Sequence, residues 1–310
     1  MTAEAFNEEL YWSVIDILNG LLTGTIIGGY YAMISIGLAM TFGVMRLVNL
    51  AHGDFIIVGA YLAVVLLNFL PISPFFTLTI VIPIMFCLGY VLQRVLLNHV
   101  SVQAMERKGL SANYGPMAPI LVTFGLGIFI SHVLLGIFES DARQLKNSLA
   151  FSAIRLSEDL NISLLRFIFF GLGIVILILL HLYLTRTHAG RAIRAASDDA
   201  EVSPLMGINT AHVYGLALGI SMAIAGAAGV MIGMIRTFQP FDGPQFLLIA
   251  FGTVIIGGLG SIVGSLVGGI LLGITQVLAG TYFGPSAQLV GGYMLILFVL
   301  AFKPQGLFSK

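Results

Sequence analysis

The sequence predicts an all-α protein that crosses a membrane about eight or nine times, and both composition and residue order lead to this class. Of the 310 residues, 58% are hydrophobic and 9% are charged, whereas an ordinary soluble domain carries roughly 25% charged residues. Long runs such as residues 167–184 are almost wholly apolar, while strands of a transmembrane β-barrel alternate apolar and polar residues. The predicted spanning elements are therefore helices.

The apolar runs divide the chain into its expected elements, taking about 20 residues for one crossing. They lie near residues 12–45, 52–70, 75–97, 117–138, 163–184, 210–235, 244–258, 262–281 and 286–303. The first run is too long for one untilted crossing. The seventh and eighth are short for two crossings, so we expect one or both of them to be broken or re-entrant.

The orientation follows from the Lys and Arg residues near the ends of the spans, because cytoplasmic loops carry an excess of them. The first sixteen residues contain four acidic residues and no basic one, so we expect this segment to be retained and to lie outside. The predicted cytoplasmic side receives most basic residues, namely Arg46, Arg94, Arg107, Lys108, Arg186, Arg191, Arg194, Lys303 and Lys310. The sequence therefore predicts an outer N-terminus and a cytoplasmic C-terminus.

The spacing of the 37 glycines predicts close helix packing. Many stand four residues apart, namely Gly24 and Gly28, Gly215 and Gly219, Gly229 and Gly233, Gly260, Gly264 and Gly268, and Gly269 and Gly273. Small residues at this spacing let two helix backbones approach closely in lipid. We expect most of these stripes to pack within the chain, and a dimer face is the alternative.

A faint similarity between residues 45–54 and 234–242 indicates possible inverted repeats. In both segments a helix end is followed by an acidic residue and a new helix. The predicted topology places the two turns on opposite sides of the membrane, as inverted repeats require.

The first polar break in the membrane pattern is residues 46–55, which contain Asn49, His52 and Asp54. Ionisable groups at membrane depth usually face the bundle interior or a water-filled path, so these three residues are candidates for a substrate pathway. The alternative is a structural turn in which Asn49 or His52 caps the helix that starts near Asp54.

The second polar break is residues 236–246, where Arg236 and Asp242 flank a turn rich in Pro and Gly. In the predicted topology both residues lie outside, where they form a candidate external mouth that meets a substrate or a docking protein. A plain connecting loop is the simpler alternative.

Several kinds of chemistry have no residues to support them. The sequence has no HExxH or GxSxG motif, so we expect no catalytic residues and no enzyme activity. Its one cysteine, Cys87, excludes an internal disulfide and a thiolate metal cluster, and we expect no metal. None of the four lysines follows a glycine, so the chain has no P-loop and any ATP is hydrolysed elsewhere.

In the second half of the chain, the long polar interval 186–214 interrupts the otherwise apolar sequence. It combines Arg186, Arg191 and Arg194 with acidic residues and helix-end signals. This mixture predicts a short amphipathic helix on the membrane surface. We expect a soluble partner to dock there, and the basic residues to anchor the preceding helix at the membrane.

Three ordered blocks, residues 37–63, 190–209 and 251–274, resemble the permease subunits of bacterial branched-chain amino-acid ABC importers, most closely the shorter H-type. The resemblance implies one permease domain over residues 1–310, in the bacterial cytoplasmic (inner) membrane, that moves aliphatic amino acids. It also implies a second permease, two cytoplasmic ATPases and an external substrate-binding protein as partners. ATP and Mg²⁺ belong to the ATPases, and no cofactor is expected on this chain.

The resemblance also assigns the ATPase-coupling loop, at about residues 186–211. The loop from Asp199 to Asn209 is similar to its docking segment, with Glu201 and Gly207 at the acidic and glycine positions, while Val202 departs from the usual alanine. The coupling residues implied by this similarity are Asp199, Glu201, Leu205, Gly207 and Asn209. We expect a short helix near residues 197–206 to transmit the ATPase motion, with Gly207 ending it. Permeases for urea and short-chain amides look similar through the same blocks, and an ATP-independent channel or a scaffold subunit are further alternatives.

Overall fold

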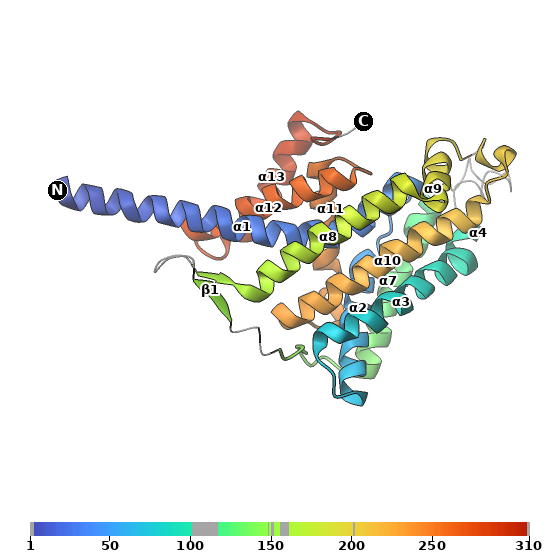
Figure 1. Cartoon of the computed structure of the whole chain (residues 1–310), viewed down its shortest axis with the longest axis horizontal. Coiled ribbons are helices and arrows are strands. Elements are labelled where there is room, and N and C mark those ends of the chain that lie inside the picture. The colour runs from blue at the N-terminus through green and yellow to red at the C-terminus, as the bar shows by residue number, and fades with distance from the viewer. Residues whose placement is uncertain are drawn as a thin grey trace.

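The computed structural model is a bundle whose helices run mostly along the long axis of the molecule, with α2 running across them (Figure 1). The structure describes residues 3–100, 117–147, 149, 152–155, 161–200 and 202–308. The main helices are α1 (Ala3–Met45), α2 (His52–Phe69), α3 (Pro74–Leu92), α7 (Met117–Phe138), α8 (Leu164–Arg186), α10 (Thr210–Ile235), α11 (Gly243–Gly257) and α12 (Ile262–Phe283). The shorter elements are the π-helical turn η1 (Gln93–Leu97), α4 (Asn98–Val100), strands β1 (Ala153–Arg155) and β2 (Asn161–Ser163), α9 (His188–Asp198), the 3-10 turns η3 (Ser203–Met206) and η4 (Pro240–Asp242), and α13 (Ala287–Phe302).

The predicted all-α, multi-pass class is confirmed. Within the described residues, eight helices are long and apolar enough to cross a membrane, and α13 is a shorter apolar helix. The strands are three residues each and pair as one small antiparallel hairpin. α11 alone has 15 residues and rises about 22 Å; it counts among the eight only together with the preceding turn η4, over residues 240–257. Whether it is broken or re-entrant stays a prediction.

Helix α10 occupies the centre of the bundle. In its most apolar stretch of 18 residues, 89% of the residues are buried, whereas the corresponding share is 22% for α3 and α7. It packs against α1, α2 and α3. Small residues allow this contact on several sides, because Gly226 lies against Met85 of α3 and Gly229 lies against the backbone of Ile56 in α2.

The glycine stripes pack within the chain, as predicted. A side chain at Gly24 of α1 would lie 2.9 Å from the backbone nitrogen of Ile274, and Gly28 meets the backbone next to Gly269. Because neither helix has a Cβ atom at these positions, the α1 and α12 backbones touch directly. The contact fixes α12 along the length of α1.

The segment between α1 and α2 turns back into the bundle. Arg46, with φ of 50°, ends α1 in a left-handed conformation. His52, six residues after Arg46, lies inside the bundle, where its Nε2 atom is 2.9 Å from the carbonyl oxygen of Ile34. Ile34 is eleven residues before Met45, about 16 Å along the helix axis. Helix α2 therefore begins deep inside the bundle.

The helices that follow the two polar breaks begin next to each other inside the bundle, while Arg46 and Arg236 line cavities at opposite ends of it. Gly53 at the start of α2 packs against the backbone of Gly243 at the start of α11. The reason is that both connecting segments enter the bundle before their helices begin, which the apolar pattern alone does not predict. An inverted repeat stays a prediction.

The segments predicted to share a side of the membrane do gather at the same end of the bundle. Ser197 of α9 donates a hydrogen bond to the carbonyl of Gly43 near the end of α1, and Phe308 donates one to Gly257. At the other end, Arg143 and Phe238 exchange two backbone hydrogen bonds of 3.0 and 2.9 Å. Which end faces the cytoplasm stays a prediction.

Candidate functional site

The candidate pathway residues of the first polar break are buried: Asn49 and His52 are each 1% exposed, and Asp54 is 6% exposed. They line neither of the two cavities described below. The Asn49 Oδ1 atom accepts a hydrogen bond of 3.1 Å from the backbone of Ala51, so Asn49 organises the turn before α2. Their burial and the bond of Asn49 fit a structural turn, but the N-cap of α2 is Ala51 and no side-chain hydrogen bond from the described residues caps this helix, so the predicted capping by Asn49 or His52 is wrong. A role in the pathway stays a prediction.

Asp54 joins three helices. Its carboxylate accepts a hydrogen bond of 2.8 Å from the Ser131 hydroxyl of α7. Gly127 of α7 and Gly243 of α11 both face the same carboxylate, where a Cβ atom would collide with it. The two glycines therefore make room for the carboxylate, and Ser131 supplies it with a hydrogen bond.

A cavity of about 200 Å³ opens at the end of the bundle that contains Arg236, and we call it the arginine cavity. Residues from α1, α8, α11, α12 and α13 line it together with the end of α10. Its polar lining consists of two tyrosines, two arginines and three glutamines, namely Tyr30, Tyr31, Arg166, Arg236, Gln245, Gln276 and Gln288. Among the described lining residues none is acidic.

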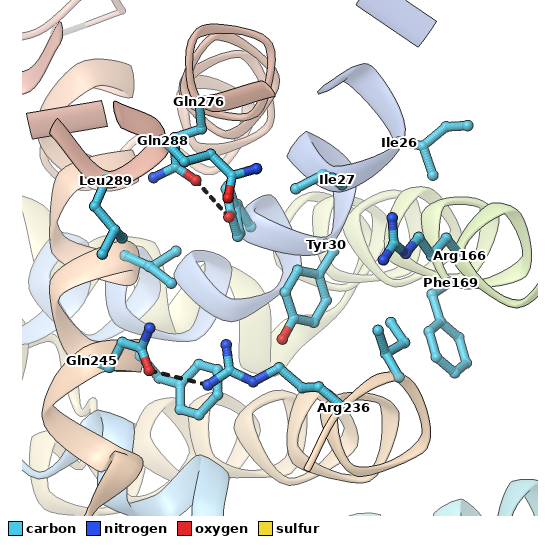
Figure 2. Close-up of a pocket in the computed structure, with 14 residues that line it drawn as sticks. Ile26, Ile27, Tyr30, Arg166, Phe169, Arg236, Gln245, Gln276, Gln288 and Leu289 are labelled. Atoms are coloured by element: carbon cyan, nitrogen blue, oxygen red, sulfur yellow. Dashed lines mark hydrogen bonds between the residues drawn. The ribbon is translucent and has the colours of Figure 1, made fainter. Parts of the chain in front are cut away.

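Arg236 lies at the centre of the cavity's polar side (Figure 2). Its Nη2 atom donates a hydrogen bond of 3.0 Å to the Gln245 Oε1 atom, and its guanidinium carbon lies 4.8 Å from the centre of the Phe246 ring. Both contacts hold the guanidinium in place beside the cavity. Figure 2 also shows the Tyr30 hydroxyl pointing toward this guanidinium.

Asp242, the other predicted mouth residue, does not line this cavity. Its Oδ2 atom accepts a hydrogen bond of 2.9 Å from the backbone of Gln239, which caps η4. The structure therefore places Arg236 and Asp242 in different roles, and the plain connecting loop is the alternative that fits Asp242.

The polar interval forms the amphipathic helix α9, as predicted. Gly190, Ile193 and Ala196 are buried, and Arg191 and Arg194 are exposed on the other side. The predicted position of the docking helix, residues 197–206, is wrong, because α9 ends at Asp198 and η3 begins at Ser203.

The side chain of Asp199 explains where α9 ends. Its Oδ1 atom accepts a hydrogen bond of 3.0 Å from the backbone of Val202, so the residue forms a turn that competes with the helix. Pro204 then lies in the first turn of η3. Asn209 has a similar local role, because its Oδ1 atom accepts a hydrogen bond of 3.0 Å from His212 at the start of α10.

The turn η3 presents large apolar side chains to the outside. Leu205 is 83% exposed and Met206 is 77% exposed. Gly207, with φ of 80°, ends the turn in a left-handed conformation, as predicted from the sequence. Glu201, the remaining candidate in this loop, lies outside the described residues. Exposed apolar residues beside a membrane bundle favour a protein partner.

A second cavity of about 870 Å³ lies beside α9, and we call it the α9 cavity. Arg46, His181 and Arg194 contribute basic groups to its wall, and Asp198 contributes an acidic one. Both cavities are lined by α1 and α8. α8 has 23 residues and rises about 35 Å, so the cavities lie at opposite ends of a membrane-length helix.

Helices α1 and α8 are in close contact next to the arginine cavity. A Cβ atom at Gly29 would lie 2.8 Å from the Phe170 Cε2 atom, and one at Gly173 would lie 3.3 Å from the Gly29 carbonyl oxygen.

Sequence reasoning missed most of the arginine cavity. Tyr30, Gln276 and Gln288 are spread over three helices, and each lies in an apolar run. The signal was available, because polar side chains within spans usually face the bundle interior. These residues meet only because α1 packs against α12 in the folded chain, which the sequence pattern does not specify.

Residues 20–302 match the protein family described as branched-chain amino acid transport system / permease component. The chain is similar to the high-affinity branched-chain amino acid transport system permease protein BraD of Pseudomonas aeruginosa, with 26% identity over 97% of both chains. It is similar to the corresponding protein LivH of Escherichia coli K12, with 25% identity over 94% of this chain and 96% of LivH. A third relative, LivM of the same organism, is 25% identical over 89% of this chain and 67% of LivM. No solved structure matches the chain.

Proposed function

Because the chain belongs to the family of branched-chain amino acid transport permease components, we propose that it is a multi-pass permease subunit of an ATP-driven importer for branched-chain amino acids. The single observation that carries this proposal is the match to permease relatives over nearly the whole chain. The bacterial cytoplasmic membrane is the proposed location. In this arrangement the α9 end faces the cytoplasm and the arginine cavity faces outward.

The proposed importer contains a second permease, two ATPases and an external binding protein. Similarity to both LivH and LivM supports a pair of related permeases. ATP and Mg²⁺ are proposed to bind the ATPases, because this sequence has no P-loop. The permease then supplies the pathway and the ATPases supply the energy.

The proposed ATPase contact is the loop from Asp199 to Asn209. Leu205 and Met206 support it, because their apolar side chains are exposed beyond the helix bundle. Asp199, Gly207 and Asn209 shape the loop through a turn, a left-handed residue and a cap. The exposed pair provides the apolar contact and the other three hold it in position.

Alternating access has structural support in the two cavities. Each lies at one end of α1 and α8, and these two helices are in close contact at Gly29 and Phe170. We propose that ATP binding moves α9, which is tied to α1 by the hydrogen bond from Ser197 to Gly43. Motion of α1 against α8 then opens one cavity and closes the other.

The test is to purify the tagged chain from its native membrane and compare it with the variant Leu205→Asp. We expect two ATPases and a second permease to co-purify with the unaltered chain, and ATP-dependent leucine uptake by the reconstituted complex. The variant should lose most ATPase, because a charge in an apolar contact must be desolvated.

Phe283→Asp is the matched control, because Phe283 is also 83% exposed but lies at the opposite end of α12 from the α9 cavity. It should retain the ATPases. Full ATPase recovery with Leu205→Asp would contradict the docking role, and leucine flux without ATP would favour a channel.

A further inference from the structure

The arginine cavity carries positive charge that the described protein does not balance. Arg166 and Arg236 both line it, none of its described lining residues is acidic, and neither arginine forms an ion pair with a described residue. Within the described part of the chain, the Arg236 side chain donates a hydrogen bond to the neutral amide oxygen of Gln245. Charged groups within a membrane protein normally have a charged or strongly polar partner. An anionic ligand would supply one.

The geometry of Arg236 suits a carboxylate. A guanidinium presents a planar fork of donors that matches the two oxygens of a carboxylate. The contact with the Phe246 ring and the hydrogen bond to Gln245 position this fork at the cavity. Arg166 lines the same cavity as Arg236 and Tyr30, so it adds a second positive charge to its wall.

The rest of the cavity suits an aliphatic amino acid. Phe169, Ile249 and Leu289 provide an apolar wall, which would contact a branched side chain. The Gln276 Oε1 atom accepts a hydrogen bond of 2.6 Å from Tyr31 and keeps a second lone pair. Together with Gln288, it offers neutral acceptors for an ammonium group.

We propose that Arg236, assisted by Arg166, binds the α-carboxylate of the transported amino acid in the arginine cavity. This inference rests on the proposed importer function and assigns the substrate site within it. It also separates two substrate classes, because urea and short-chain amides carry no negative charge for the two guanidiniums to bind. Arg236 is then a determinant of specificity for acids over amides.

The experiment uses the complete importer, with the subunits that co-purify with this chain, reconstituted in liposomes. Arg236→Gln removes the charge and retains a hydrogen-bonding side chain. We expect its ATP-dependent leucine uptake to fall at least about tenfold, since a hydrogen bond to a charged group contributes more than a neutral one. Arg236→Lys should recover part of the loss. Arg166→Gln should lower uptake about threefold, because an exposed charge is screened by solvent.

Arg143→Gln is the matched control, because it removes the same charge at the same end of the bundle outside the cavity. Its uptake should stay within about twofold of the unaltered importer. A second readout needs no transport: leucine, but not leucinamide, should raise the unfolding temperature of the permease and ATPase complex, and Arg236→Gln should abolish this shift.

Each result has a defined meaning. Leucine uptake by Arg236→Gln at the level of Arg143→Gln would overturn the inference and leave the importer function intact. Accumulation of urea or acetamide, but not leucine, by the unaltered importer would overturn the proposed function itself. If Arg236→Gln fails to retain its ATPases, Arg166→Gln decides, and unchanged uptake in that variant would overturn the inference.

Discussion

At the residue scale, the hydrogen bond between Ser131 and Asp54 shows how a buried charge is kept inside the bundle. The Ser131 hydroxyl donates to the Asp54 carboxylate at 2.8 Å, and both residues are at most 6% exposed. We predict that Ser131→Ala lowers the free energy of unfolding by about 1–3 kcal/mol, because the carboxylate would lose a donor in a place that water does not reach freely. Thermal unfolding of the purified permease measures this loss.

Ser35→Ala is the control for this prediction. Ser35 is also a buried helical serine, but its hydroxyl donates to the carbonyl of Ala32 within its own helix, so its removal leaves no charged group without a donor. Equal unfolding temperatures for the two variants would contradict the role given to Ser131. The sequence indicated that Asp54 is important, but Ser131 is 77 positions away, and only the packed structure identifies it as the partner.

At the scale of elements, the contact of α1 with α12 depends on glycine. We predict that Gly28→Ala lowers the unfolding temperature, because the added methyl group would collide with the backbone at Gly269 and Ile270, and overpacking typically costs about 1–3 kcal/mol. Gly171→Ala in α8 is the control, since a Cβ atom there has no neighbour within 4 Å. It should be neutral or slightly stabilising, because alanine favours a helix by about 0.5–1 kcal/mol over glycine.

If Gly28→Ala and Gly171→Ala unfold at the same temperature, the close approach of α1 to α12 is wrong. At this scale the sequence was informative. Apolar runs located the helices, since lipid requires about 20 apolar residues for a crossing, and glycine spacing indicated which faces pack. Neither pattern specifies which glycine stripe meets which, nor that α2 and α11 begin at the same place, because those facts depend on contacts between distant segments.

At the scale of the whole molecule, the orientation of the bundle gives a direct prediction. In a Cys87→Ala background, a cysteine at Arg191 of α9 should react with a membrane-impermeant maleimide only in inside-out vesicles. A cysteine at Asp141, whose side chain is 72% exposed, should react only in intact cells. The expected sides follow from the excess of Lys and Arg in cytoplasmic segments. The reverse pattern of labelling would overturn the proposed orientation.

Much less of the candidate site than of the fold was predictable. Arg236 was identified because it interrupts an apolar pattern, and Gly207 because helical turns often end on glycine. Tyr30, Gln276 and Gln288 form part of the same cavity, yet single polar residues in separate spans give no indication that they meet. A site assembled from six helices depends on the packing of all six, and local sequence patterns do not contain that information.

The length of helix α1 affects how motion at one of its ends reaches the other. It is a single helix of 43 residues without proline, and its N-terminal part extends beyond the rest of the bundle in Figure 1. If this helix moves as a rigid body, it pivots about its tight contact with α12 at Gly28. Met45 is 17 residues from Gly28, about 26 Å along the axis. A tilt of about 10° would displace that end by on the order of 5 Å, and the far arm would swing in the opposite direction.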